Sequence, residues 1–245
     1  MRIDSAGNVG IGTNDPTQKL HIYNGNASAP TDANTHVVIE DDGHCYLGIY
    51  GGATSDVGIH FGDTAIDGRV AYSNNARTLG LRAGTGTDDI TIDSAGSVNM
   101  PAQPAFLVLK SSSDDQNNIA INSDVTITFD TEVFDQGADF ASNTFTAPVT
   151  GRYQINFRMR VAIIDTAATA YDVTLVTSNR GYEWTVSPGS AYSSDVAKIT
   201  YSGSVLADMD ASDTAYLKIY QTSGSAQSDI IGSTYTTSFS GFLAC

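Results

Sequence analysis

One short segment combines side chains that often recognise ligands. Arg180, Tyr182 and Trp184 lie within five residues, and Tyr192 follows eight residues after Trp184. Aromatic rings supply large, rigid contact areas in interfaces, and their faces also stack on sugar rings. The sequence therefore predicts that these four residues bind a ligand. The alternative is that the aromatic residues pack within a strand or between subunits.

A second segment is rich in carboxylates, which are the ligands that calcium prefers. Asp208, Asp210 and Asp213 lie within six residues. An EF-hand loop needs glycine at its sixth position and glutamate at its twelfth, but Asp213 and Ile219 occupy those positions. We interpret these residues as solvated turn acids and predict no cofactor and no metal ligands. The alternative, a calcium ion held outside an EF-hand loop, has no assignable ligands.

The histidines argue against a catalytic site in the second half of the chain. All four precede residue 61: His21, His36, His44 and His60. A Ser-His-Asp or Cys-His site therefore cannot form within residues 101–245. His44 adjoins Cys45, but successive side chains on a strand point to opposite faces. The sequence predicts no catalytic residues and no enzyme activity.

The two cysteines are far apart in the sequence. Cys45 and Cys245 are separated by 200 residues, which is neither a disulfide framework nor the spacing of a metal site. Two unpaired thiols are the expected state, and a bridge between them is the alternative.

Charge and hydropathy exclude two classes of partner. The chain of 245 residues has a formal net charge of −15 at pH 7. Such a surface repels phosphate backbones, and no cluster of basic residues in the sequence offsets it. No apolar stretch approaches the roughly 18 residues that a membrane span requires. The sequence predicts no nucleic-acid partner and no membrane insertion.

Composition changes near residue 100. Residues 1–100 contain 15 of the 23 glycines, whereas residues 101–245 contain eight of the nine phenylalanines and the single tryptophan. Pro101 and Pro104 lie at the change and favour a break between elements. We therefore predict two domains, a fibrous β-rich stalk at 1–100 and a head at 101–245.

The first domain repeats a short pattern and is poor in large apolar residues. Ile3–Val9 and Ile92–Val98 share the pattern Ile-Asp-Ser-Ala-Gly-x-Val, in which x is any residue. Both copies predict a strand, a turn and a strand. Short strands with few large side chains bury too little surface to offset the cost of ordering the backbone. Three chains wrapped together would supply the missing core and cover the open sheet edges. The expected strands are 37–39, 46–50, 57–61, 69–72, 78–81 and 89–92.

The start of this domain resembles a known fibre element. Gly7–Thr13, followed by Pro16 and Lys19–Ile22, is similar to a motif of bacteriophage tail fibres and some bacterial surface fibres. In those proteins the motif belongs to trimeric, β-rich stalks. The resemblance implies a trimeric, glycine-rich β-stalk over residues 1–100.

The second domain shows the alternation of β-strands. Between Tyr153 and Val161, apolar residues alternate with polar ones, which is typical of a strand with one buried face. We expect eight to ten strands, no amphipathic helix and two packed antiparallel sheets. The expected strands are 106–110, 125–129, 153–161, 171–177, 197–206, 215–219 and 236–244.

The same domain resembles the C1q-like family. The residues that carry the resemblance are Phe129-Asp130, Asp135, Phe140, Phe145, Pro148, Gly151-x-Tyr153-x-Ile155-x-Phe157 and the terminal Phe239-Ser-Gly-Phe-Leu243. The resemblance implies an all-β protein that ends in a C1q/TNF-like jelly-roll β-sandwich, a fold that forms trimers and recognises ligands. The aromatic residues of the run from Phe129 to Phe157 are expected to be core residues that specify this scaffold.

The two resemblances together predict a trimeric phage tail-fibre or receptor-binding protein of the virion. Its expected partners are two further copies of itself and a host cell-surface glycan or protein. One alternative is a secreted C1q-like lectin or adhesin, extracellular or at a cell surface. Another is a tailspike-type enzyme that cleaves polysaccharide with paired carboxylates. A purely structural role without a ligand also stays open.

Overall fold

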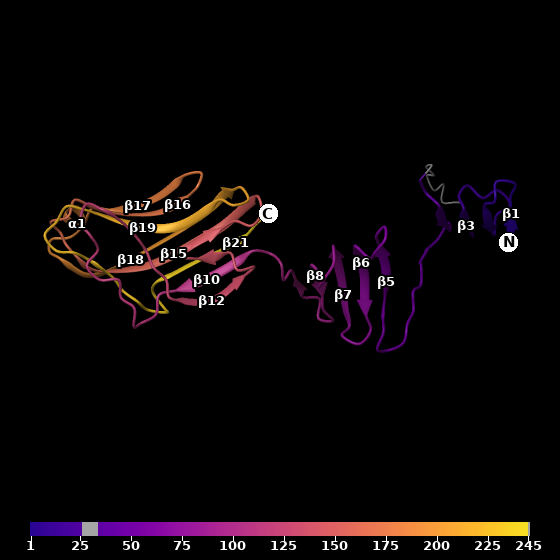
Figure 1. The fold of residues 1–245 in the computed structure, drawn as a ribbon, viewed down its shortest axis with the longest axis horizontal. Helices are drawn as coiled ribbons and strands as arrows, with labels where there is room; N and C mark the ends of the chain where they lie inside the picture. Colours follow the sequence, from indigo (N-terminus) through magenta and orange to yellow (C-terminus); the bar gives the residue numbers. More distant parts are fainter. Residues whose placement is uncertain (26–33, 245) are drawn as a thin grey trace. The chain divides into compact units, whose positions relative to one another are not determined.

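The computed structural model describes residues 1–25 and 34–244, and these residues are almost entirely β-structure (Figure 1). The chain divides into two compact units: Met1–Gly86 with Ile92–Gly96, and Thr87–Thr91 with Ser97–Cys245. Within the described residues, no helix is long and apolar enough to cross a membrane.

The residues up to Met100 form two separate sheets. In the first, β1 and β2 are antiparallel, and β2, β3 and β4 are parallel. In the second, β5, β6 and β7 are antiparallel neighbours, followed by β8 and β9. The expected strand at 46–50 is not formed. The strands are β1 Arg2–Ile3, β2 Val9–Ile11, β3 Leu20–Tyr23, β4 Val37–Glu40, β5 Asp56–Phe61, β6 Gly68–Ser73, β7 Thr78–Ala83, β8 Ile90–Ile92 and β9 Val98–Asn99.

The repeated pattern forms the same turn twice. Oδ1 of Asp4 accepts the N–H of Ala6 at 2.9 Å, and Oδ1 of Asp93 accepts the N–H of Ala95 at 2.8 Å. The glycine that follows each turn has a positive φ, 77° at Gly7 and 86° at Gly96, as glycine allows without steric cost. The sequence repeat is therefore also a structural repeat.

The C-terminal unit is a sandwich of two antiparallel sheets (Figure 1). One has the order β12-β10-β21-β15-β18, with β20 paired to β15. The other has the order β13-β14-β19-β16-β17, with β11 paired to β19. The elements are β10 Ala105–Leu109, β11 Asp124–Thr126, β12 Thr131–Gln136, β13 Phe140–Ala141, β14 Thr144–Thr146, β15 Gly151–Ile164, β16 Ala170–Thr177, β17 Gly181–Val186, α1 Pro188–Ala191, β18 Val196–Met209, β19 Thr214–Thr222, β20 Asp229–Ile230 and β21 Ser238–Leu243.

This unit has more strands than expected. β12 and β17 lie in segments for which the sequence predicted none, and the strand expected at 125–129 ends at Thr126. The sequence of β12, Thr-Glu-Val-Phe-Asp-Gln, lacks period-2 alternation, and its pairing with β10 carries a register irregularity. Edge strands of this kind are stabilised by their neighbour more than by their own pattern.

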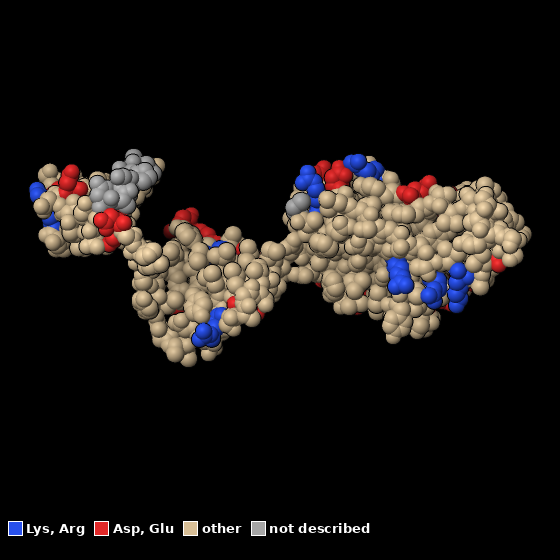
Figure 2. All heavy atoms as spheres, turned by 180° about the vertical axis from the view of Figure 1, so that it is seen from behind, with Lys and Arg blue, Asp and Glu red and all other residues tan. Residues whose placement is uncertain are grey.

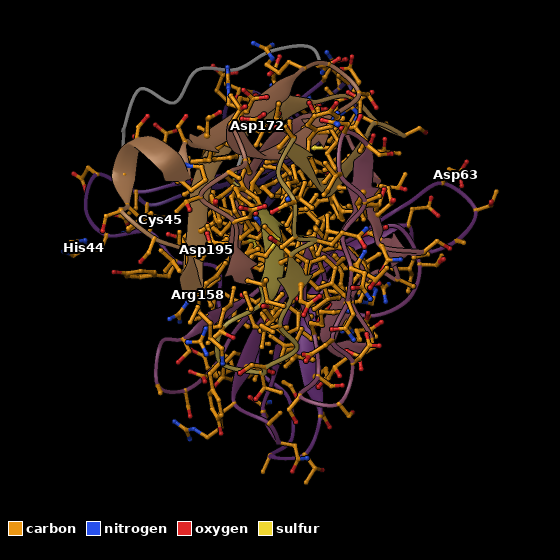
Figure 3. The ribbon with its side chains drawn as sticks, turned by 90° about the vertical axis from the view of Figure 1, so that its left-hand side faces the viewer. His44, Cys45, Asp63, Arg158, Asp172 and Asp195 are labelled. Atoms are coloured by element: carbon orange, nitrogen blue, oxygen red, sulfur yellow. The ribbon has the colours of Figure 1, made fainter. Side chains whose placement is uncertain are left out.

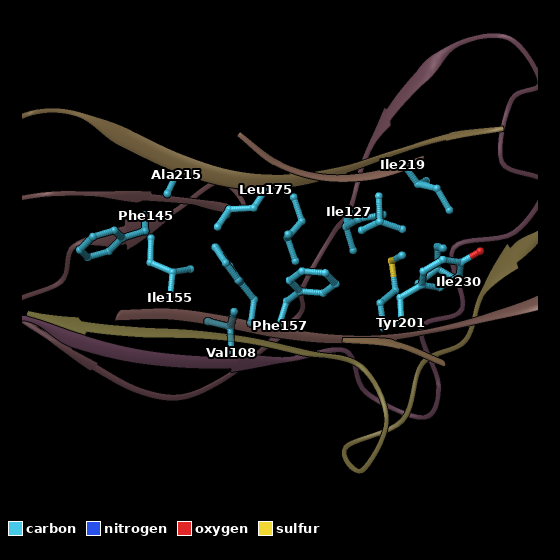
Figure 4. Packing of buried hydrophobic residues seen from close by; sticks show 14 of the residues in the cluster. Val108, Ile127, Phe145, Ile155, Phe157, Leu175, Tyr201, Ala215, Ile219 and Ile230 are labelled. Atoms are coloured by element: carbon cyan, nitrogen blue, oxygen red, sulfur yellow. The ribbon is translucent and has the colours of Figure 1, made fainter. Parts of the chain in front are cut away.

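The core between the two sheets contains most aromatic residues of the family signature (Figure 4). These residues are Phe129, Phe140, Phe145, Tyr153, Phe157 and Phe239. Tyr153, Ile155 and Phe157 are buried, as the alternation predicts. The ring of Phe106 lies 4.7 Å from that of Phe145 and 5.1 Å from that of Phe239. The expectation that these residues specify the scaffold agrees with this packing.

The hairpin between β13 and β14 explains the close spacing of Phe140 and Phe145. These two residues pair directly across the hairpin. Ser142 and Asn143 form the turn with φ of 50° and 65°, as a two-residue type I′ connection requires. The carboxylate of Asp135 accepts the N–H of Phe140 at 2.9 Å and so fixes the start of β13.

One carboxylate organises a loop at the end of the sandwich that carries α1. Asp165 accepts the N–H groups of Ala167 at 2.8 Å, Ser225 at 2.5 Å and Ala226 at 2.9 Å. These backbone hydrogen bonds lower the pKa of Asp165 below its usual value, because they stabilise the charged form. The bond from Ala226 has the largest effect, followed by that from Ser225.

We expect Asp165→Asn to lower the free energy of unfolding by about 1 kcal/mol at pH 7, because one charged acceptor is lost. The lowered pKa means that this stabilisation is present above the unfolded-state pKa and disappears as pH falls through the folded-state pKa. Thermal unfolding of wild type and variant, measured between pH 7 and pH 2, checks this. A difference in Tm that stayed constant into acid would contradict it.

Candidate assembly and binding surfaces

The structure does not bring the four predicted ligand-binding residues into one site. Arg180 precedes β17, and its Nη2 lies 2.7 Å from Oδ2 of Asp208. Tyr182 and Trp184 lie on the face of β17 that packs against the core. The rings of Trp184 and Phe157 meet edge-on at 4.7 Å. Tyr192 follows α1 and is 40% exposed. Ligand binding by these residues stays a prediction.

The close fit at Trp184 depends on a glycine. Gly203 lies opposite Phe157 in the ladder of β15 and β18. A Cβ at this position would collide with the rings of both Trp184 and Phe157. Trp184 sits inside β17, directly opposite Val173 of β16.

The carboxylates of the 208–213 turn are occupied by protein groups. Oδ2 of Asp213 accepts the N–H of Asp210 at 2.8 Å and Nδ2 of Asn179 at 3.0 Å. Asp208 pairs with Arg180. In the described part of the chain, no group of three His, Cys, Asp or Glu side chains could hold a metal ion. The geometry is that of a capped turn.

The four histidines and Cys45 lie in the first hundred residues. Nε2 of His21 lies 3.3 Å from Oε2 of Glu40, and both side chains are buried. His44 and Cys45 project from the ribbon in Figure 3, and the Cys45 thiol is free and exposed. Cys245 lies outside the described residues.

The outward face of the sheet β12-β10-β21-β15-β18 is partly apolar, and we call it the assembly face. The strand register aligns its side chains in rows across the sheet. One row contains Ala105, Phe242, Gln154 and Leu206. The exposed fraction is 47% for Phe242 and 54% for Leu206.

The neighbouring row of the assembly face adds further apolar and polar groups. It contains Phe134, Leu107, Ser240, Asn156 and Ser204. Phe134 is 46% exposed in the isolated chain. An apolar surface of this kind on a soluble protein usually marks an interaction site.

A hydrogen-bonded polar group lies between the apolar residues of the assembly face. Nε2 of Gln154 donates to Oγ of Ser204 at 2.8 Å, and Oγ of Ser204 donates to Oδ1 of Asn156 at 2.8 Å. These side chains satisfy much of their own hydrogen bonding, so covering them leaves few unpaired polar atoms. Apolar anchors around such a group match the composition of protein interfaces.

Sequence reasoning missed Phe242 and Leu206 as surface residues. Phe242 belongs to the terminal signature, but it lies three positions after the buried Phe239. Residues an odd number apart on a strand face opposite sides, so this spacing was the available signal. Leu206 lies two positions after Ser204 on the same strand, and residues two apart share a face. This spacing places Leu206 on the polar face.

The second sheet of the first hundred residues also has an apolar face. One row consists of Ile59, Val70 and Leu81, and the next consists of Val57, Tyr72 and Leu79. The opposite face carries the small residues Gly58, Ala71 and Gly80 in the intervening row. We call the face that carries these two rows of larger side chains the stalk face.

Hydrophobic side chains are mostly exposed in the first hundred residues and mostly buried in the rest of the chain. Among the described residues up to Met100, the structure buries two hydrophobic side chains, Val38 and Ala71, and leaves 17 large ones exposed. Among those after Met100 it buries 25 and leaves eight large ones exposed. The first part therefore lacks a hydrophobic core within one chain.

Comparison with known proteins shows likeness for the C-terminal unit. No curated protein matches the chain. The globular domain of zebrafish complement 1qA protein is 16% identical, with a TM-score of 0.42, and the match covers 58% of this chain and 98% of that one. Murine APRIL at pH 8.0 is 11% identical, with a TM-score of 0.41 and the same coverages of 58% and 98%.

A sequence-family match decides the family. The profile described as "C1q domain" matches residues 105–244, which is more than half of the chain. This range contains both sheets of the sandwich and the aromatic signature. The chain belongs to the C1q domain family.

Proposed function

We propose that this protein is a homotrimeric fibre whose C-terminal C1q domain attaches to a host-surface glycan or protein, as in a phage tail fibre. The observation that carries the proposal is the assembly face, which exposes Phe134, Leu206 and Phe242 in a single chain. C1q domains are binding modules that form homotrimers and are typically extracellular, so a second and a third copy are the natural cover for this face.

The first hundred residues support the same proposal. A single sheet with one apolar face and almost no core does not persist alone in water. Three copies that place their stalk faces against one another would bury Val70 and Tyr72 and supply the missing core. The resemblance of Gly7–Thr13 to tail-fibre sequences agrees with a trimeric stalk.

A trimer gains binding strength by carrying three identical sites. Three weak contacts with one surface produce an avidity far above the affinity of each contact. Fluorescently labelled full-chain protein, applied to a glycan array and to intact bacterial cells, tests attachment. Binding by the trimer that is lost on dissociation to single chains supports the function. Absence of binding to every cell and glycan surface contradicts it.

Val70→Asp is expected to open the proposed stalk without unfolding the C1q domain. The variant places a charge in the central strand of the stalk face, where it would be buried between copies. We expect trypsin to cleave after Arg82 about tenfold faster than in wild type, because local opening exposes the backbone. Residues 101–245 should stay intact on the gel.

Thr78→Asp is the matched control, because Thr78 aligns with Ser73 and Asp56 on the opposite face of the same sheet. Its cleavage rate should stay close to that of wild type. Equal cleavage of the two variants would show that the stalk face is not covered.

A further inference from the structure

Most basic side chains of the C-terminal unit have an acidic or other polar partner. Residues 101–245 contain seven Lys and Arg. Lys110, Arg180 and Lys218 lie within 2.9 Å of carboxylate oxygens, and Arg152 is also engaged. In the described part of the chain, no Asp or Glu oxygen lies within 4.0 Å of the other three: Arg158, Arg160 and Lys198.

These three side chains gather on one face of one ladder. In the pairing of β15 with β18, Arg158 lies opposite Ser202, Arg160 opposite Thr200, and Lys198 opposite Ala162. The positions are alternate residues of paired strands, so all three point outward from the same sheet. Consecutive rows are about 7 Å apart. We call this group the basic cluster.

The cross-strand neighbours of Arg158 are polar and uncharged. Ser202 and Ser238 flank Arg158 on the two neighbouring strands. In Figure 2, a group of Lys and Arg side chains without Asp or Glu between them is visible on the C-terminal unit. The Arg158 side chain extends away from the ribbon in Figure 3.

Two carboxylates close the α1 end of the same region, but other groups occupy them. Oδ1 of Asp195 accepts the N–H of Thr166 at 2.8 Å and its hydroxyl at 2.7 Å. Oδ1 of Asp229 accepts the N–H of Asn118 at 2.8 Å. Each carboxylate thus holds a loop, and among residues 1–25 and 34–244 the three cations have no ion pair.

The basic cluster occupies the other half of the sheet from the apolar rows. Phe242 and Leu206 align with Gln154 near the start of β15, whereas Arg160 lies toward its end. Within the sandwich, the C-terminus and α1 mark these two opposite ends in Figure 1. Copies that associate through the apolar rows would bring like charges toward one another at the α1 end, which favours binding of an anion there.

We propose that Arg158, Arg160 and Lys198 form a binding site for the anionic groups of an acidic surface polysaccharide. The cations would contact carboxylate, phosphate or sulfate groups, and the hydroxyls of Ser202 and Ser238 would hydrogen-bond sugar hydroxyls. The net charge of −15 disfavours long polyanions elsewhere on the surface, so recognition is confined to this cluster. This inference rests on the proposed attachment function and names its ligand class.

The test compares the full-chain wild type with Arg158→Gln/Lys198→Gln, which removes two exposed cations without altering the core. The probes are polygalacturonate, dextran sulfate and neutral dextran, and the readout is biolayer interferometry at several salt concentrations. We expect wild type to bind an acidic probe with an affinity that falls as salt rises. The variant should bind at least about tenfold more weakly, and neither protein should bind neutral dextran.

Arg69→Gln/Lys218→Gln is the matched control, because it removes the same charge from two cations that have carboxylate partners. Equal loss in this control, or no acidic binding by wild type, would overturn the proposal. Native mass measurement separates the other outcomes. A cluster variant that dissociates to single chains would show that the cations pair with carboxylates of a second copy. A wild type that is itself a single chain would refute the trimer.

Discussion

Phe242→Asp/Leu206→Asp is expected to convert the proposed homotrimer into single chains. Both side chains lie in one row of the assembly face and are about half exposed in the isolated chain. Burial of each would contribute roughly 1.5–3 kcal/mol per interface, and a buried, unpaired carboxylate adds a further cost. Because this change occurs in every copy, the trimer should not persist at about 10 μM protein. Size-exclusion chromatography with light scattering measures the result.

The matched control is Tyr216→Asp/Tyr220→Asp. These residues occupy outward positions of β19, between the buried residues of the other sheet. The control should keep the mass of wild type, because that sheet has no part in the proposed assembly. A double variant of Phe242 and Leu206 that kept wild-type mass would remove the assembly face from the account, and so would a control that dissociated.

Phe106→Ala is expected to have the largest effect on the stability of the C1q domain. Phe106 is 1% exposed and packs against three other phenylalanines, with ring centroids 4.7–5.2 Å away. Truncation of such a ring removes buried area and leaves a cavity, at a cost of about 3–5 kcal/mol. For a domain of this size we expect Tm to fall by about 10 °C or more.

Differential scanning calorimetry at one fixed protein concentration measures this, because trimer stability depends on concentration. Tyr235→Ala is the control, since Tyr235 is 83% exposed and its removal should change Tm by less than about 2 °C. Similar Tm values for Phe106→Ala and wild type would contradict the central position of Phe106 in the core.

The two packed sheets could be predicted because their core residues carry a periodic signal, and the resemblance to the C1q-like family implied the jelly-roll. Tyr153, Ile155 and Phe157 alternate with polar residues, and the structure buries them within the long strand β15. β12 gave no such signal, and β17 was not predicted although its Tyr182, Trp184 and Val186 alternate with smaller or polar residues. Their pairing with β10 and β16 stabilises them, and the sequence of one strand does not reveal its neighbour.

The candidate surfaces were harder to predict than the core. Alternation predicts which residues face outward, but it does not show which outward residues align across five strands. Phe242, Gln154 and Leu206 are far apart in the sequence and become neighbours through the register alone. The basic cluster has the same origin, since Lys198 is 38 residues from Arg160 and meets it across one ladder.

The expectation of a stalk without its own core came from composition. The first hundred residues are rich in glycine and contain one phenylalanine, Phe61, and the structure leaves that side chain 55% exposed. The expected strand at 46–50 failed even though Tyr46 and Tyr50 favour strands, because no neighbour pairs with the segment. Composition thus predicted the need for a partner better than it predicted each strand.

Native mass spectrometry of the full wild-type chain tests the central claim most directly. The chain has a mass of 25.8 kDa, and at low micromolar concentration the account predicts a single species of three times this mass. Loss of that species in Phe242→Asp/Leu206→Asp, under the same conditions, would tie it to the assembly face. A wild-type spectrum dominated by the single-chain mass would contradict the account.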